Sequence, residues 1–194
     1  MTSFLVIGHT ASTDASFPLD DLPGMGGRMD LISRVIASSL FLSHGIRTDT
    51  ICDILLLGPP HPGRIIRFDG SDLKSLSPDE RNIASYIKKA LAIPAGRTYR
   101  KAGPGLFTRK GTLGDLITEK NYAVLDESGT DIRTVALEDM PDAFLLSDNR
   151  NFTEDERSVV RDLPKYALGP AIVHADHAIV LILNEIDRRR SGWI

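Results

Sequence analysis

The chain has 194 residues, a length that suits one domain with a buried core. Its 42% hydrophobic and 25% charged residues are the proportions of an average globular protein. The formal net charge of −3 excludes a chain that attracts nucleic acid through its overall charge, so any RNA contact must come from a local basic patch.

The cysteine content and the length of the apolar runs limit the cellular compartments in which the protein could work. A single cysteine, Cys52, excludes a disulfide within the chain and stands in an apolar run typical of a core position. No run approaches the roughly twenty apolar residues of a membrane span. The N-terminal segment lacks the basic region and the apolar length of a signal peptide. We therefore expect a soluble cytoplasmic protein.

The first elements alternate between strand and helix patterns. Residues 4–7 form a short apolar run that predicts a buried strand. Apolar residues then recur at helical spacing over residues 29–42. A continuous apolar strand is expected at 51–57 and another strand at 64–68, and the two can form a hairpin with a long turn.

Residues 77–80, Ser-Pro-Asp-Glu, predict the start of the next helix. Ser77 is the expected cap and Glu80 its partner in a capping box. The helix is expected to run to about Leu91. Residues 95–111 follow as an irregular segment that holds five lysines and arginines and no acidic residue.

The second half continues the alternation. Thr153 and Glu156 have the spacing of a second capping box. The expected elements are a short helix at 114–120, a strand at 122–125, a turn at 126–129, a strand at 143–146, a helix from Thr153 and a last helix at 176–190.

This alternation predicts an α/β fold with a mostly parallel sheet and helices on both faces. In open sheets of this kind, ligands bind beyond the carboxyl ends of the strands. Those ends are the loops after Ile7, Leu57, Leu125, Leu146 and Leu168.

Two histidines flank an acidic residue near the C-terminus. His174 and His177 do not have the spacing of two ligands on one helix face, and no cysteine is near them. We expect Asp176 to cap the last helix and no metal to bind. The chain also has no phosphate-binding glycine loop after a strand.

The run LGPAIVHADHAI at 168–179 suits a flat, weakly charged ligand. A Gly-Pro turn after a strand presents backbone N–H and C=O groups that can bind an adenine edge. Ile172 and Val173 can cover the face of such a ligand.

Five segments, in the same order, give the chain a resemblance to the archaeal-type tRNA pseudouridine N1-methyltransferases, a SPOUT family that also has bacterial members. They are DLPGMGGRMDLISR (21–34), SSLFLSHGIRTDT (38–50), LLGPPHP (56–62), LSPDERNIASYIKKAL (76–91) and LGPAIVHADHAI (168–179). The resemblance implies one SPOUT-like methyltransferase domain over residues 1–194, a C-terminal trefoil knot, a homodimer, and S-adenosyl-L-methionine (SAM) bound in the knot loops.

The resemblance also implies the cofactor residues. They are Leu125, Ser147, Leu168, Gly169, Pro170, Ala171, Ile172, Val173 and Ala178. Two of them depart from the family pattern, which often has glycine at 147 and cysteine at 178.

Transfer of a methyl group to pseudouridine N1 requires that this nitrogen lose a proton, which a nearby carboxylate could accept. Asp30 is the leading candidate, and Arg28 beside it could bind a phosphate or a developing oxyanion. A pair that only caps or solubilises the helix is the alternative. Asp176 is a second carboxylate candidate.

The basic segment is the expected RNA contact, and its Gly and Pro content suggests a mobile loop. Its residues are Arg97, Arg100, Lys101, Arg109 and Lys110, with Arg64 and Arg67 as candidates to extend it.

The sequence therefore favours a SAM-dependent enzyme that methylates N1 of pseudouridine, in the T-loop of tRNA. Two alternatives stay open. One is a SPOUT methyltransferase that acts on another RNA nucleotide, such as one in ribosomal RNA. The other is a non-catalytic RNA-binding homologue.

Overall fold

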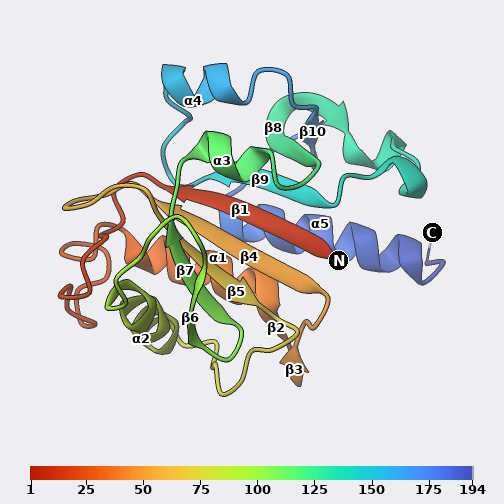
Figure 1. The fold of residues 1–194 in the computed structure, drawn as a ribbon. Helices are drawn as coiled ribbons and strands as arrows, with labels where there is room; N and C mark the ends of the chain where they lie inside the picture. The colour runs from red at the N-terminus through yellow and green to blue at the C-terminus, as the bar shows by residue number, and fades with distance from the viewer. Residues whose placement is uncertain (194) are drawn as a thin grey trace.

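The computed structural model describes residues 1–193. One sheet of eight strands, in the order β10-β8-β9-β1-β4-β5-β7-β6, forms its centre (Figure 1). These strands are β1 (Thr2–Gly8), β4 (Thr50–Leu56), β5 (Arg64–Asp69), β6 (Arg100–Gly103), β7 (Leu106–Lys110), β8 (Tyr122–Asp131), β9 (Ala143–Ser147) and β10 (Lys165–Ala167). A separate small ribbon pairs β2 (Phe41–Leu42) with β3 (Gly45–Ile46).

The sheet is parallel in one half and antiparallel in the other. Strands β10, β8, β9, β1 and β4 pair in parallel. Strands β5, β7 and β6 continue the sheet in antiparallel pairs. The expected hairpin of the strands at 51–57 and 64–68 is confirmed as β4–β5, with Ile54 opposite Ile66. The prediction of a mostly parallel sheet is confirmed for the five strands from β10 to β4, whereas β5, β7 and β6 are antiparallel.

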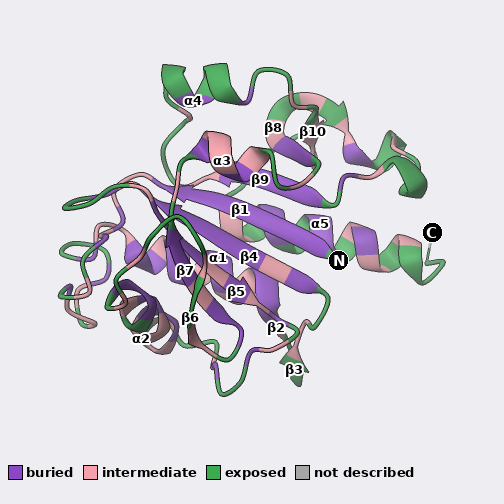
Figure 2. Cartoon of the chain, in the orientation of Figure 1, coloured by how far each residue is buried: buried purple, intermediate pink, exposed green. Residues whose placement is uncertain are grey.

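Helices cover both faces, as the alternation predicted (Figure 1). They are α1 (Met29–Leu40), α2 (Glu80–Leu91), α3 (Leu113–Ile117), α4 (Glu154–Val159) and α5 (Ala175–Arg190), with 3-10 turns η1 (Ile132–Thr134) and η2 (Leu137–Asp139) between β8 and β9. Because side chains alternate along a strand, Phe4 and Val6 pack with α1, α2 and α5, whereas Leu5 and Ile7 pack with α3 and Val160 after α4. Strand β1 is buried on both faces (Figure 2).

Two segments differ from the sequence prediction. Residues 95–111 are not irregular, because β6 and β7 form a hairpin there, with Gly105 at φ 62° in its turn. Residues 126–129 are not a turn, because β8 continues through them beside β10. Gly129 permits this pairing, since a Cβ there would lie 2.5 Å from the Lys165 backbone.

Two expected helix caps are also wrong. Asp79, not Ser77, caps α2 and accepts a hydrogen bond from the Asn82 N–H at 2.9 Å. The α5 cap position is His174, without a side-chain cap, and Asp176 lies inside the first turn. The Thr153–Glu156 capping box is confirmed.

No helix within residues 1–193 combines the length and the hydropathy that crossing a membrane requires.

A buried ion pair joins β4 to β5. Asp53 is fully buried and accepts two hydrogen bonds from Arg67, at 2.7 Å from Nε and 2.9 Å from Nη2. The Arg67 guanidinium stacks 4.3 Å from the centre of the Tyr99 ring, and the Lys120 amine lies 4.0 Å from Asp53. Arg67 is therefore a structural residue and not part of an RNA-binding surface. Arg64 is likewise buried and donates to carbonyls at the end of α2.

We expect Arg67→Met to lower the free energy of unfolding by about 3 kcal/mol, because it leaves the buried Asp53 charge without its guanidinium. Urea denaturation measures the change. The double variant Asp53→Leu/Arg67→Met removes both charges and should recover part of the loss. A double variant less stable than Arg67→Met would contradict this account.

Candidate active site

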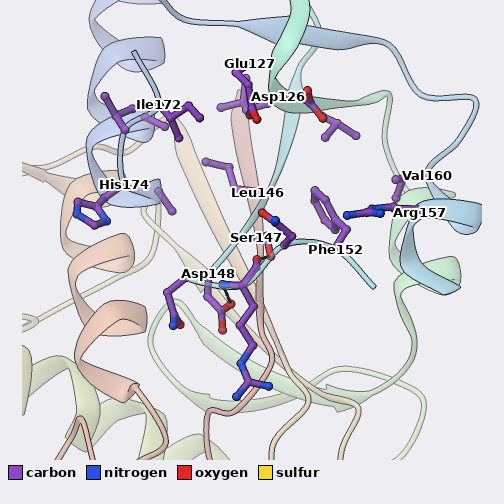
Figure 3. A pocket seen from close by; sticks show the side chains of 18 of the residues that line it. Asp126, Glu127, Leu146, Ser147, Asp148, Phe152, Arg157, Val160, Ile172 and His174 are labelled. Atoms are coloured by element: carbon purple, nitrogen blue, oxygen red, sulfur yellow. Dashed lines mark hydrogen bonds between the residues drawn. The ribbon is translucent and has the colours of Figure 1, made fainter. Parts of the chain in front are cut away.

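A cavity of 790 Å³ opens where β8 and β9 meet the start of α5 (Figure 3). Its walls come from α1, the first half of β8, the end of β9, the segment from β9 through α4, and residues 172–178. The cavity thus lies at the carboxyl end of β9, as the sequence predicted, and beside the first half of β8 and the start of β10. The loops after Ile7 and Leu57 do not line it.

Five of the nine expected cofactor residues line this cavity. They are Leu125, Ser147, Ile172, Val173 and Ala178. The other four, Leu168, Gly169, Pro170 and Ala171, lie outside its walls. Ile172 and Val173 are exposed at 77% and 39%, unusual for apolar side chains, so they are available to cover a ligand. Ser147 donates its hydroxyl to the Arg150 carbonyl, which fixes the loop after β9.

Arg28 and Asp30 form the ion pair that their spacing suggested, at the start of α1. Two hydrogen bonds join them, at 3.0 Å from Nε and 3.1 Å from Nη2. Arg28 has the left-handed backbone (φ 70°, ψ 30°) that side chains rarely adopt, a strain found most often at functional sites. Gly27 also has positive φ, and a Cβ there would collide with the Thr10 carbonyl.

The Asp30 carboxylate has little basicity left. Burial opposes its ionisation, but the hydrogen bonds and charge of Arg28 outweigh that effect and hold the pKa of Asp30 below its usual value. Neither Arg28 nor Asp30 lines the cavity. Asp30 is thus already paired, at the edge of the site.

Arg34 links this pair to the cavity. Its Nη1 lies 3.3 Å from Asp30 and 3.4 Å from Glu80, and its Nε lies 3.6 Å from Asp176. Asp176 lines the cavity, and its side chain is 14% exposed. Of the two carboxylates proposed from sequence, Asp176 is the one that faces the ligand space.

His9 joins β1 to the wall of the cavity. Its Nδ1 lies 2.8 Å from Asp148, and its Nε2 lies 3.0 Å from Glu156. The hydrogen bond to Asp148, opposed by burial and aided by the bond to Glu156, raises the pKa of His9 above its usual 6.5. Glu156 also closes the capping box with Thr153, so the hydrogen bond to His9 ties the first turn of α4 to the end of β1.

The basic segment lies at the edge of the sheet that is farther from the cavity. Arg97, Arg100, Lys101 and Lys110 are exposed, on or beside β6 and β7 at the sheet edge opposite β10. Arg109 is buried, pairs with Glu119 and stacks on Tyr99. The predicted set of RNA contacts is therefore corrected by leaving Arg109 out. Within residues 1–193, no three His, Cys, Asp or Glu side chains form a group that could hold a metal ion.

Sequence reasoning missed the segment from Asp148 to Arg161, which supplies much of the cavity wall. One signal for it was present. His9 follows the first strand and Asp148 follows another strand, so parallel pairing of those strands would have placed the two side chains together.

We expect His9→Gln to lower the free energy of unfolding by about 2 kcal/mol at mildly acidic pH, because two charge-assisted hydrogen bonds are lost. The raised pKa of His9 means that its contribution is present below 6.5 and is lost as pH rises through the folded value. Burial opposes ionisation of Glu156, but bonds from Thr153 and His9 lower its pKa, so its contribution is lost as pH falls below 4.5. Urea denaturation should therefore show a larger effect at mildly acidic than at alkaline pH.

His44→Gln is the matched control, because His44 is exposed at the β2–β3 turn. A His9→Gln effect that is independent of pH, or equal to that of the control, would show that the imidazole does not act as a charged clamp.

Comparisons with known proteins show the family of the chain. A family model described as "Putative SAM-dependent RNA methyltransferase" matches residues 1–191. A tRNA (pseudouridine(54)-N(1))-methyltransferase from Methanospirillum hungatei is 81% identical over the full length of both chains. The enzyme of that name from Methanocorpusculum labreanum is 49% identical, over 97% of this chain and 98% of its own.

The fold has a counterpart among solved structures. The crystal structure of Archaeoglobus fulgidus Nep1 bound to S-adenosylhomocysteine matches with a TM-score of 0.67, over 98% of this chain and 99% of that one, at 14% sequence identity. That likeness concerns the fold alone. The family model and the full-length relatives go further, and by them the chain belongs to this family of SAM-dependent RNA methyltransferases.

Proposed function

We propose that this protein transfers a methyl group from SAM to N1 of pseudouridine in the T-loop of tRNA. The observation that carries the proposal is full-length identity of 81% to a relative named for that reaction at position 54. The cavity beside Arg28, Arg34 and Asp176 supplies a site for it. The specific nucleotide comes from the relatives, and the geometry supports a reaction of this class.

The cavity fits the cofactor. Its volume of 790 Å³ is within the usual range of small-molecule sites, and its walls combine apolar residues with charged and polar ones. The flat adenine would be held by Leu125, Ile172, Val173 and Ala178. The small side chain of Ser147 would let the backbone lie close to the cofactor. When bound, SAM supplies an activated methyl group that needs no further activation by the protein.

The chain's own residues have two tasks in this reaction. They align the pseudouridine base with the bound cofactor, which lowers the entropic part of the barrier. They also accept the N1 proton and stabilise the anionic base. Arg28 is the candidate to stabilise the anionic base, and its ion pair with Asp30 holds its guanidinium in one orientation.

Two carboxylates compete as the proton acceptor. The sequence favours Asp30, whereas the geometry favours Asp176, since Asp176 lines the cavity and Asp30 does not. We propose that Asp176 accepts the proton and that Asp30 positions Arg28 and Arg34.

The assembly and chain threading are also proposals. A C-terminal trefoil knot is proposed from the family resemblance. The last turn of α5 packs against the β8–β9 connection, where Arg189 donates to the carbonyls of Ile132 and Val135. A homodimer is supported by exposed apolar side chains on α5, Val180 at 50% and Leu181 at 43%. We further propose one domain over residues 1–194, SPOUT-like and cytoplasmic.

The exposed side chains of Arg97, Arg100, Lys101 and Lys110 remain the proposed contact for the body of the tRNA. Their charge is local and faces solvent, as binding to phosphates requires. Lys101 pairs with Asp72 at 2.8 Å, so it would exchange that partner for a phosphate.

Removal of the protein from its source cell should abolish N1-methylpseudouridine in tRNA while pseudouridine remains. Mass spectrometry of tRNA nucleosides from a deletion strain and its complemented control measures both. Unchanged N1-methylpseudouridine would refute the tRNA assignment. Loss of a methyl mark in ribosomal RNA instead would support the alternative substrate, and absence of SAM binding in calorimetry would support a non-catalytic homologue.

Asp176→Asn should lower turnover by about a hundredfold or more, the usual contribution of a general base, and flatten the acid limb of the pH–rate profile. Asp30→Asn should lower turnover while that limb stays, because it acts through Arg28 and Arg34. Single-turnover rates across pH measure both variants. Loss of the limb in Asp30→Asn, with Asp176→Asn fully active, would return the role to Asp30.

A further inference from the structure

Basic side chains gather on one wall of the cavity, on the segment between β9 and β10. We define the α4 rim as Arg150, Arg157, Arg161 and Lys165, all of which line the cavity. Arg157 pairs with the exposed Glu154 at 3.1 Å, and Lys165 pairs with Asp126 at 3.2 Å. Arg150 and Arg161 form no ion pair with any residue in the described range 1–193.

The α4 rim rests on a fixed support. The capping box of α4 and the His9–Glu156 hydrogen bond hold the first turn of the helix. Val160 anchors its end, 4% exposed in the core beneath. Arg157 lies in α4 and Arg161 follows two residues after its end, and both side chains line the cavity. Figure 3 shows Arg157 directed toward Phe152 in the cavity wall.

The reaction places a demand on this wall. A nucleotide whose base enters the cavity must leave its stack, and its own backbone phosphates then lie at the cavity mouth. The segment β6–β7 cannot meet those phosphates within one protomer. From β9 to β7 the sheet takes four strand steps of about 4.8 Å each, roughly 19 Å in all.

We propose that the α4 rim, through Arg157 and Arg161 above all, binds the phosphates that flank the target nucleotide. This inference rests on the proposed function and adds a second RNA contact to it, at the reacting nucleotide instead of the tRNA body. Arginine suits the task because its planar guanidinium can donate two hydrogen bonds to one phosphate. The Arg157–Glu154 pair is exposed and costs little to exchange.

The test compares Arg157→Gln/Arg161→Gln with the control Arg188→Gln. Arg188 is exposed in the last turn of α5, at the other end of the helix from the cavity. The probe is a tRNA T-arm hairpin with pseudouridine in its loop, titrated without SAM at several salt concentrations. SAM affinity is measured separately by calorimetry, and folding by circular dichroism.

The double variant should bind the hairpin about tenfold or more weakly, because each lost charge-assisted contact contributes up to an order of magnitude. The slope of log affinity against log salt should fall by about 1.4, roughly 0.7 for each phosphate contact. SAM affinity and the Arg188→Gln values should match the wild type.

Unchanged hairpin affinity and salt slope in a folded double variant would overturn the proposal. So would weaker SAM binding with hairpin binding intact, since the arginines would then serve the carboxylate of the cofactor. Failure of the proposed function is visible separately: wild-type protein would bind the hairpin without methylating it, and the affinity comparison would still decide the role of the rim.

Discussion

The site depends on the parallel pairing of β8, β9 and β1, which brings the ends of β1 and β9 beside the first half of β8. Because β1 and β9 run side by side, His9 at the end of β1 meets Asp148 at the end of β9. His9 then reaches Glu156 and fixes α4 over the cavity. The pairing register of β1 and β9 thereby positions His9, α4 and the cavity wall that α4 forms.

A chain of charges crosses the other side of the cavity. Arg34 lies between Asp30, which holds Arg28, and Asp176, which faces the ligand space. Such a chain ties the start of α1 to the start of α5, two helices far apart in sequence but packed together. It also explains how the strained backbone of Arg28 is retained, because an ion pair and close contacts around Gly27 hold it.

The sequence predicted what local patterns encode. Apolar runs located β1, β4 and β9, and the Thr153–Glu156 spacing located α4. It failed where tertiary contacts decide. β8 passes through a turn-like stretch because Gly129 lets β10 approach, and the basic hairpin β6–β7 was hidden by lysines and arginines between its inward residues. The cavity wall from α4 has no periodic signature, so the sequence prediction missed it, whereas the strand ends and the family resemblance located the part formed by Leu125, Ser147 and Ile172.

Synthetic T-arm hairpins test whether the protein methylates N1 of pseudouridine. Purified protein is incubated with SAM and two hairpins that differ only in pseudouridine or uridine at the target position, and each product is digested and analysed by mass spectrometry. We expect one added methyl group on the pseudouridine hairpin and none on the uridine hairpin. Equal methylation of both hairpins, or of neither while SAM binds, would overturn the proposed function.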